Sequence, residues 1–315
     1  MQVIICTLFE GHYHYGLAAL TNSLCSGGYR GDIYAGYRGT LPEWSHDAKE
    51  NASLNWPGAT TLIVAENLNL HFLPLKVDCH LTNYKPHFMQ LLLNGQIKEA
   101  DGIAYFDPDI VLNCKWETIE NWMDYGVALV HETVMHDFPP SHPLRKQWEE
   151  VIIKCNRSVN RELHHYINAG FCGIKKENYE FIELWAEIID TAVRDFDFDN
   201  VNFMPLDRTF LFHASDQDAL NITAMSCNCP ISEMGPEAMD FIPGGWIMSH
   251  ALGKPKPWEK RYLISLLEGC PPTLADKRYW ANVNGPIMIF SFFKTRITFL
   301  KIKIGSFLGR FYVKN

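Results

Sequence analysis

Short apolar runs alternate with stretches of helical spacing over most of the chain. The apolar runs predict strands at 3–7, 32–37, 61–64, 102–106, 126–131, 169–174 and 246–249. Apolar residues three and four apart predict helices at 15–24, from 82 or 83 to 93, and at 142–155, 177–193 and 216–224. This alternation predicts an α/β protein whose parallel or mixed sheet is covered by helices.

The composition is that of a globular protein. The chain has 315 residues, of which 47% are hydrophobic and 20% are charged, which excludes disorder and collagen-like repeats. The length allows one large domain or two small ones. A formal net charge of −8 disfavours a general nucleic-acid binder, so we expect no nucleic-acid partner.

The charge is unevenly distributed along the chain. Residues 277–315 contain eight Lys or Arg and no Asp or Glu, so they carry +8 and residues 1–276 carry −16, which is −8 less 8. The composition shifts at about residue 272. We therefore expect a main domain at 1–272 and a basic, aromatic C-terminal extension at 273–315 that has a partner of its own.

The extension has two interpretations. Its Phe, Ile and Lys residues suit the surface of an anionic membrane, although a helical wheel does not bring the charges to one face. Alternatively, the segment packs on the domain and its charges are simply solvated. Under the first interpretation the protein lies peripherally on the inner face of a membrane.

The cysteines and the N-terminus indicate a cytoplasmic protein. Nine scattered cysteines include no Cys-x-x-Cys pair, which favours reduced thiols in a reducing compartment. The apolar stretch 3–6 follows no basic region and is too short for a signal peptide. The apolar run at 280–293 is shorter than the roughly 18–20 residues that span a bilayer.

The first candidate site is Asp107-Pro108-Asp109, which follows an apolar strand. Side chains two positions apart in extended chain share a side, so the two carboxylates can converge on a hard cation such as Mg²⁺ or Mn²⁺. Ligands of α/β proteins also bind at the carboxyl ends of parallel strands. The alternative is a surface turn, because Asp-x-Asp also occurs at 195–199 and 216–218.

Two other patterns fail on spacing. The acidic segment that starts at Asp195 has Asn200 and Leu206 where a calcium-binding EF-hand loop needs Gly and Glu. His131 and His136 lie five residues apart, whereas the zinc-protease motif needs four. We expect His131 to end a strand.

The second candidate site runs from His250 to Trp258 and reads H-x-x-G-x-x-K-P-W. His250 is a possible metal ligand, Gly253 allows close backbone approach to a ligand, and Lys256 is a mobile point charge suited to a phosphate. Each of these residues, taken alone, more often has a structural role than a functional one. Their combination in one segment is a specific sequence pattern.

Together with Asp107 and Asp109, this segment resembles glycosyltransferase family 8. Two further segments fit the family pattern: Tyr166 to Ile174, with its Asn-Ala-Gly, and the Asp-Gln-Asp-Ala-Leu-Asn run at 216–221. The four segments stand in the family's order and extend over residues 1 to about 260.

The resemblance implies a single-domain GT-A fold, with a Rossmann-like mixed sheet flanked by helices. It also implies retaining transfer of a hexose from a nucleoside-diphosphate sugar, usually a UDP-sugar, to a saccharide or glycolipid acceptor. The roles that it implies cover metal binding by Asp107, Asp109 and His250, diphosphate contact by Lys256 and Gly253, and donor-sugar contact by Asn168, Asp216 and Gln217. The implied metal is Mn²⁺ or Mg²⁺.

One segment departs from the family pattern, and one residue is ambiguous. Family members often carry Asp or Asn, with Tyr, soon after the first strand to hold the uridine, whereas this segment runs from Thr7 to Tyr13 without Asp or Asn. Thr7 and Tyr13 are therefore the candidates for nucleoside contact. Lys85 lies where the family often has a basic residue near the donor, and it is equally compatible with a solvated lysine at a helix start.

Two other functions compete with glycosyl transfer. An apolar strand followed by Asp107-x-Asp109 also fits a phosphohydrolase of the haloacid dehalogenase type, but the downstream acidic motif of that class is missing and the segment from His250 stays unexplained. A non-catalytic sugar-nucleotide-binding protein is the third possibility. The retained Asp107, Asp109 and His250 argue against it.

Overall fold

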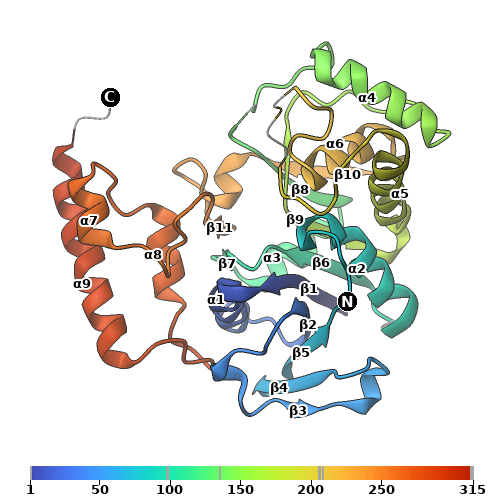
Figure 1. Ribbon diagram of the computed structural model, residues 1–315. Coiled ribbons are helices and arrows are strands. Elements are labelled where there is room, and N and C mark those ends of the chain that lie inside the picture. The colour runs from blue at the N-terminus through green and yellow to red at the C-terminus, as the bar shows by residue number, and fades with distance from the viewer. Residues whose placement is uncertain (1, 97–98, 135, 205–206, 208, 313–315) are drawn as a thin grey trace.

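The computed structural model describes residues 2–96, 99–134, 136–204, 207 and 209–312. Within these residues a nine-stranded mixed sheet has the strand order β10-β8-β9-β6-β1-β2-β5-β4-β3 (Figure 1). Its strands are β1 (Val3–Glu10), β2 (Gly31–Arg38), β3 (Lys49–Glu50), β4 (Thr60–Ala65), β5 (Leu68–Pro74), β6 (Gly102–Phe106), β8 (Val127–His131), β9 (Ile167–Lys175) and β10 (Ile231–Met234). The central strands β6, β1, β2 and β5 are parallel, whereas β9 runs antiparallel to both β6 and β8.

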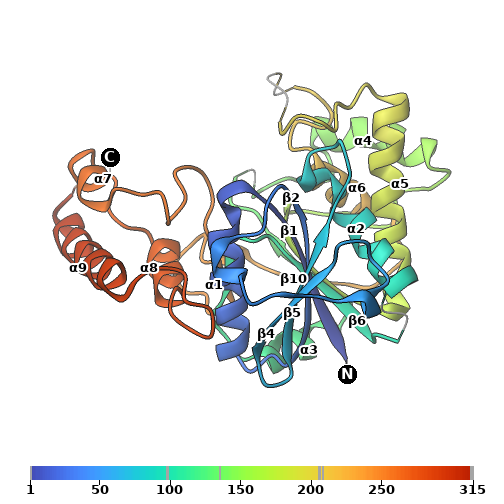
Figure 2. The same ribbon diagram turned by 60° about the horizontal axis from the view of Figure 1, so that its bottom comes forward.

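Helices cover both faces of this sheet (Figure 2). Helices α1 (His14–Ser26) and α3 (Trp116–Met123) cover one face, and α2 (Lys85–Leu91), α4 (Pro143–Lys154), α5 (Glu180–Asp195) and α6 (Asp216–Ser226) cover the other. Strand β1 shows how the sequence divides between the faces, since Ile4 and Cys6 pack on one side and Val3 and Ile5 on the other. A strand buried on both faces reads as a continuous apolar run, as the sequence analysis expected.

Most predicted elements are confirmed within a few residues, and His131 ends β8 as expected. The main difference is the predicted strand at 246–249. Strand β11 (Met248–His250) lies outside the main sheet and forms a small antiparallel sheet with β7 (Ile110–Leu112). The sequence analysis also missed β5, whose polar Asn69 and His71 interrupt the apolar run because they bind the Asp32 carboxylate.

The small sheet brings the two candidate segments together. β6 ends at Phe106 and β7 begins at Ile110, so Asp107 and Asp109 lie in the tight connection between the two strands. In the β7–β11 ladder His250 lies opposite Ile110, and the Ala251 N–H donates to the Asp109 carbonyl at 3.1 Å. The carboxylates therefore converge through a turn, and not through strand alternation as the sequence analysis supposed.

The C-terminal part of the chain forms helices α7 (Tyr262–Leu267), α8 (Leu274–Ala281) and α9 (Phe292–Leu308) at one side of the sheet, with α8 against α1 (Figures 1 and 2). Tyr279 and Trp280 of α8 are buried with Ala19 of α1. The Asn22 side chain fixes this contact, because it donates to two backbone carbonyls and accepts the Ile287 N–H at 2.9 Å. The start of the basic extension thus packs on the sheet domain, while the division at residue 272 stays a prediction.

Helix α9 is exposed along much of its length and carries charges around its circumference, as the helical wheel indicated. None of the helices in the described part of the chain combines the length and apolar character needed to cross a membrane.

Candidate functional site

Three potential metal ligands converge at the carboxyl end of β6. His250 Nε2 lies 3.2 Å from Asp109 Oδ1 and 3.8 Å from Asp107 Oδ2. One ligand atom from each of the three residues lies within 4.8 Å of the others. His250 and Asp109 are buried, whereas Asp107 keeps 23% of its side chain exposed, so the set opens to solvent through Asp107.

Gly170 on β9 makes room for this set. A Cβ atom added at Gly170 would lie 2.6 Å from His250 Cε1 and 2.8 Å from the Asn168 amide oxygen. The Gly170 carbonyl also accepts the Asp107 N–H at 2.7 Å, which fixes the start of the turn. The Asn-Ala-Gly run is therefore placed beside the candidate metal ligands.

Lys256 supplies a positive charge at Asp109. Its ammonium group pairs with Asp109 Oδ2 at 2.5 Å and also donates to the Ala251 carbonyl at 2.7 Å. Burial alone would raise the pKa of Asp109, but the charges of His250 and Lys256 outweigh it and hold that pKa well below its usual range. Asp109 is therefore ionised at neutral pH.

Lys85 is the second ammonium group and is nearly fully buried, at 2% exposure. It lies 3.0 Å from Asp107 Oδ1 and 2.9 Å from Asp216 Oδ2, and it donates to the Ala169 carbonyl at 3.0 Å. Burial alone would lower the pKa of Lys85, but the two carboxylates outweigh it and raise that pKa well above its usual value. Lys85 is therefore buried and paired, and not a solvated helix-start lysine, while its place near a donor stays a prediction.

Asp216 and Gln217 begin α6 beside β9. Burial raises the pKa of Asp216 to about 6, even though Lys85 acts to lower it. Gln217 Oε1 accepts the Ala169 N–H at 3.0 Å, so its amide is oriented by the strand. The structure thus brings Asp216 and Gln217 close to β9 and Lys85, while their contact with a donor sugar stays a prediction.

Asn168 has a partner that the sequence analysis did not single out. Its Nδ2 donates to Glu132 Oε2 at 2.6 Å, and its Oδ1 accepts the Gly170 N–H at 2.8 Å. Glu132 is itself buried, at 6% exposure. The available signal was its position directly after the strand that ends at His131, an edge where ligands bind in α/β sheets.

Asp218 is a buried hydrogen-bond acceptor next to the candidate site. It accepts the Tyr166 hydroxyl at 2.5 Å and the Ala214 N–H at 2.6 Å, and it is almost fully buried. Burial raises the pKa of Asp218 to about 7, and the nearby Asp216 charge contributes to the rise. The sequence pattern predicted the Asp-Gln-Asp run as a helix start, but it could not show that its second carboxylate is a buried acceptor.

The three remaining candidates occupy different environments. Tyr13 lies near Lys256, whose Nζ is 5.7 Å from the ring centroid, and its ring packs edge-on against Trp258. Gly253 has φ +72° and nothing within 4 Å of an added Cβ, in the exposed loop after β11. Thr7 lies fully buried inside β1, and its hydroxyl has no hydrogen-bond partner among the described residues. Nucleoside contact by Thr7 and Tyr13 stays a prediction.

Comparisons with known proteins identify the fold. Neither the protein-family models nor the curated protein sequences gave a match to this chain. Among solved structures, the galactosyltransferase LgtC, in complex with donor and acceptor sugar analogues, is similar with a TM-score of 0.51 and 13% identity over 89% of this chain and 94% of that one. The bifunctional glycosyltransferase WbbM matches with a TM-score of 0.51 and 14% identity, and this chain spans 51% of its length.

A third similar structure is the glycosyltransferase GlyE of Streptococcus pneumoniae, with a TM-score of 0.50 and 12% identity over 96% of this chain and 64% of that one. At these identities the likeness concerns the fold. The chain has the GT-A fold of these glycosyltransferases, a mixed α/β sheet flanked by helices in one domain, as the sequence resemblance implied.

Asp218 gives a prediction about pH and stability. Its pKa of about 7 in the folded protein exceeds its ordinary value of 3.8, so between these pH values the folded state binds more protons than the unfolded state. The contribution of Asp218 to the free energy of unfolding should therefore fall as pH rises through this window, by up to about 1.4 kcal/mol per pH unit. Asp218→Asn cannot titrate and should remove this part of the slope, which urea unfolding at several pH values measures.

Asp47→Asn is the matched control, because Asp47 is 81% exposed in its side chain. It should keep the wild-type pH slope. An unchanged slope in Asp218→Asn would show that Asp218 does not bind a proton in this range.

Proposed function

We propose that this protein is a retaining glycosyltransferase that moves a hexose from a nucleoside-diphosphate sugar, a UDP-sugar, to a saccharide or glycolipid acceptor. The observation that carries the proposal is the convergence of Asp107, Asp109, His250 and Lys256 at one edge of a GT-A sheet. A second polar group lies on the other side of Lys85 from Asp107 and consists of Asn168, Asp216 and Gln217, whose amide and carboxylate groups can form hydrogen bonds with sugar hydroxyls.

The ligand set fits Mn²⁺ or Mg²⁺. Two carboxylates and one imidazole suit a hard or borderline divalent cation, and Asp107, Asp109 and His250 would hold it. The ammonium groups of Lys85 and Lys256 already lie among the carboxylates of Asp107, Asp109 and Asp216. A divalent cation would add two positive charges to this group, which favours an anionic diphosphate.

One set of residues acts on the leaving group, and another acts on the sugar. When bound, the cation acts as a Lewis acid that stabilises the negative charge of the departing nucleoside diphosphate. Lys256 lies beside Asp109 and can donate to the same diphosphate, as a movable point charge. We assign to the oxygens of Asp216 and Gln217 the stabilisation of the positive charge that develops on the sugar. Lys85 and the backbone of β9 fix the orientation of these two side chains.

Two routes to retention use the same residues. Gln217 or Asp216 can attack the anomeric carbon from the face opposite the leaving group, or the acceptor can attack from the leaving-group face while these residues stabilise the cationic sugar. In both routes Lys85 keeps Asp107 and Asp216 at fixed positions on either side of one ammonium group.

The neighbours of Asp107 and Asp109 favour the transferase over the phosphohydrolase alternative. His250 lies beside both carboxylates, and Lys256 pairs with Asp109. The transferase reading also gives His250 and Lys256 a role, which the phosphohydrolase reading does not.

Donor hydrolysis tests the proposal most simply. The full-length protein with Mn²⁺ should slowly release nucleoside diphosphate from one member of a panel of sugar nucleotides, and EDTA should abolish the release. Asp109→Asn should lower the rate on the order of 100-fold or more, since a neutral amide cannot balance the cation and diphosphate.

Asp101→Asn is the control, because Asp101 is an exposed carboxylate outside the site. Its rate should equal that of the wild type. Full activity in EDTA would remove the metal from the proposal, turnover of a phosphomonoester would favour the phosphohydrolase, and tight donor binding without any hydrolysis or transfer would indicate a non-catalytic binding protein.

We also propose that the C-terminal extension attaches the enzyme peripherally to the cytoplasmic face of an anionic membrane, near a glycolipid acceptor. Helix α9 and the residues after it expose large apolar side chains, namely Phe292, Phe293, Leu300, Ile304, Phe307, Leu308 and Phe311. A groove of about 360 Å³ beside them is lined by Lys277, Lys303 and Arg310 together with Phe299 and Phe307. Cations around an apolar groove suit lipid phosphates above acyl chains.

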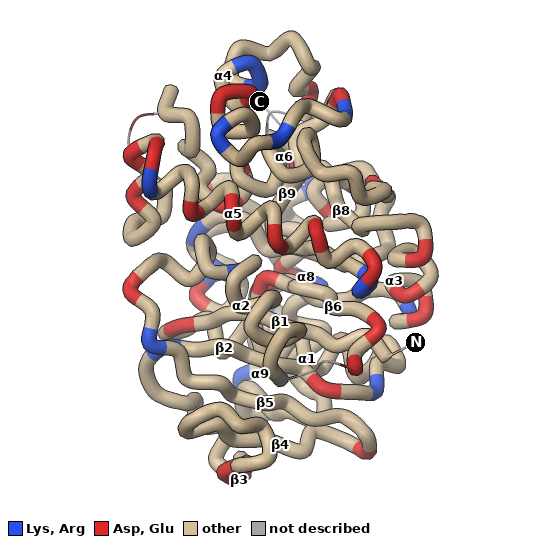
Figure 3. The backbone as a smooth tube through the Cα atoms, turned by 90° about the vertical axis from the view of Figure 1, so that its right-hand side faces the viewer, with Lys and Arg blue, Asp and Glu red and all other residues tan. Residues whose placement is uncertain are grey.

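The negative charge of the remainder of the protein also favours an orientation in which α9 faces the membrane. Residues 1–276 carry a net −16, and Figure 3 shows acidic positions spread over the face that carries α3 and α5. An anionic surface should repel that face and attract α9, each nearby Lys or Arg contributing on the order of 1 kcal/mol at low salt.

Sedimentation with vesicles tests the attachment. The full-length protein should sediment with phosphatidylglycerol-containing vesicles at low salt and much less at high salt or with pure phosphatidylcholine. Lys301→Glu/Lys303→Glu/Arg310→Glu should lose this binding. Lys49→Glu/Lys146→Glu/Lys154→Glu changes the net charge equally at exposed positions elsewhere and should keep it. Equal loss in both variants, or a wild type that never sediments, would leave α9 without a membrane role.

A further inference from the structure

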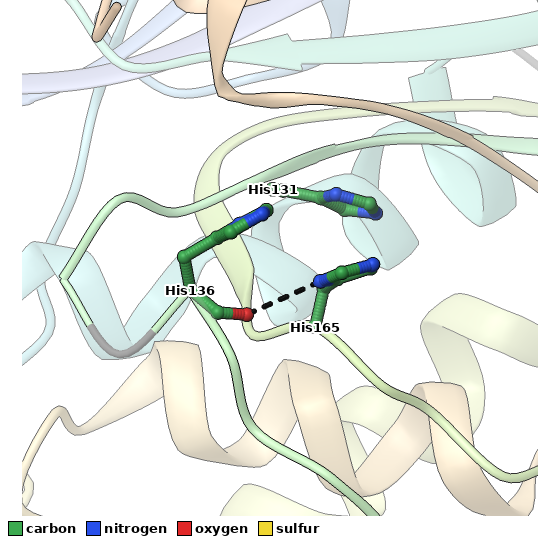
Figure 4. Close-up of side chains that lie close together, drawn as sticks. All are labelled: His131, His136 and His165. Carbon is green, nitrogen blue, oxygen red and sulfur yellow. Dashed lines mark hydrogen bonds between the residues drawn. The ribbon is translucent and has the colours of Figure 1, made fainter.

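Three histidines lie close together where the chain leaves β8 and where it enters β9 (Figure 4). His131 ends β8, His136 lies in the connection that follows, and His165 precedes β9. The ring centroids of His165 lie 4.4 Å from those of His131 and 4.5 Å from those of His136. One ring nitrogen of each histidine lies within 4.8 Å of one from each of the others. This group shares no residue with the Asp107, Asp109 and His250 set.

Hydrogen bonds fix the tautomer of each ring. His131 Nε2 lies 2.9 Å from Glu233 Oε2, His136 Nδ1 lies 3.2 Å from the Glu132 carbonyl, and His165 Nδ1 lies 3.3 Å from the His136 carbonyl. Carboxylate and carbonyl oxygens only accept hydrogen bonds, so each of these nitrogens carries the hydrogen. The other nitrogen of each neutral ring is thereby left as a lone-pair donor.

The hydrogen bonds of the three rings are of the kind that orients histidine ligands in metal sites. Metal-ligating histidines almost always donate their second ring N–H to a carboxylate or backbone carbonyl, and here all three do so. His131 is buried, whereas His136 and His165 are partly buried, so the group can be reached from solvent. Neutral imidazole nitrogens are preferred ligands of Zn²⁺ and similar ions, and are poor ligands for Mg²⁺.

We propose that His131, His136 and His165 bind one divalent transition-metal ion of the Zn²⁺ class, separate from the cation at Asp107 and Asp109. Zn–N bonds of about 2.0–2.1 Å in a tetrahedral site place ligand nitrogens about 3.3 Å apart. Because the rings of His136 and His165 are stacked with an interplanar angle of 14°, ring rotation on binding brings their in-plane lone pairs to one ion. His136 lies in a loop and can make this adjustment. Glu233 orients His131, and a water or another ligand completes the coordination.

An ion bound by the three histidines would also affect Asn168 of the candidate glycosyltransferase site. Glu132 lies between two of the ligands in sequence, and its carboxylate binds Asn168 at 2.6 Å. His165 precedes the same strand that carries Asn168 and Gly170. An ion held by the three histidines therefore ties the connection after β8 to the start of β9 and keeps Glu132 against Asn168.

Metal titration of the full-length protein tests the proposal. With saturating Mg²⁺ present, calorimetric titration with Zn²⁺ should show one tight equivalent more for the wild type than for His136→Gln/His165→Gln. Co²⁺ should give the intense visible absorption of four-coordinate cobalt in the wild type, and Zn²⁺ should bleach it. Glu233→Gln should weaken Zn²⁺ binding about 10–100-fold, because it removes the partner that orients His131.

His46→Gln/His164→Gln is the matched control, since both residues are exposed and His164 is the direct neighbour of His165. It should bind Zn²⁺ as the wild type does. Equal numbers of Zn²⁺ equivalents in the wild type and His136→Gln/His165→Gln would overturn the proposal. Should that variant unfold, anomalous diffraction at the zinc edge from wild-type crystals decides: a peak among the three rings supports the site, and a peak only elsewhere, or none, overturns it.

Discussion

Lys85 is the residue on which the geometry of the candidate site most depends. Its ammonium group is buried between Asp107, which we propose as a metal ligand, and Asp216, which we propose to contact the donor sugar, and it also binds the Ala169 carbonyl of β9. An ammonium ion without these partners would not remain charged at this depth. Removing one partner of such a buried pair costs about 3–5 kcal/mol, because the other charge stays buried and unpaired. One side chain on α2 thereby fixes the relation between β6, β9 and α6.

Lys256 balances the other carboxylate in a different way. It reaches Asp109 from the loop after β11, on a flexible stem, and Asp109 also receives His250. Lys85 is held by three fixed partners, whereas Lys256 is anchored by Asp109 and one carbonyl. The difference matches the roles proposed for them, since Lys85 maintains the position of groups that must not move and Lys256 is free to turn toward a diphosphate.

Much of this arrangement could be predicted from local sequence. The apolar runs before Asp107 and around Gly170 predicted β6 and β9, and the segment from His250 to Trp258 was specific enough to indicate the fold. The GT-A fold followed from that resemblance and is confirmed by structural comparison. The approach of the two carboxylates was also expected, although it arises from a turn that the β7–β11 ladder holds.

Contacts between distant segments could not be predicted in this way. Lys85 has the same sequence signature whether buried or solvated, and only the packing of α2 against β6 and α6 decides which it is. His131, His136 and His165 have no ligand spacing in the sequence, since β8 and β9 bring them together only as neighbouring strands of one sheet. The polar face of β5 and the docking of α8 through Asn22 likewise depend on partners far away in the chain.

The central claim is that Asp107, Asp109 and His250 bind a cation that also contacts a nucleotide diphosphate. A crystal structure of the full-length protein with Mn²⁺ and UDP, with the ion located by its anomalous signal, tests it most directly. The account predicts Mn²⁺ coordinated by all three residues and by the diphosphate, with Lys256 turned from Asp109 toward a phosphate oxygen. Nucleotide bound elsewhere, or bound here with Lys256 still paired to Asp109 and no Mn²⁺ at these residues, would contradict it.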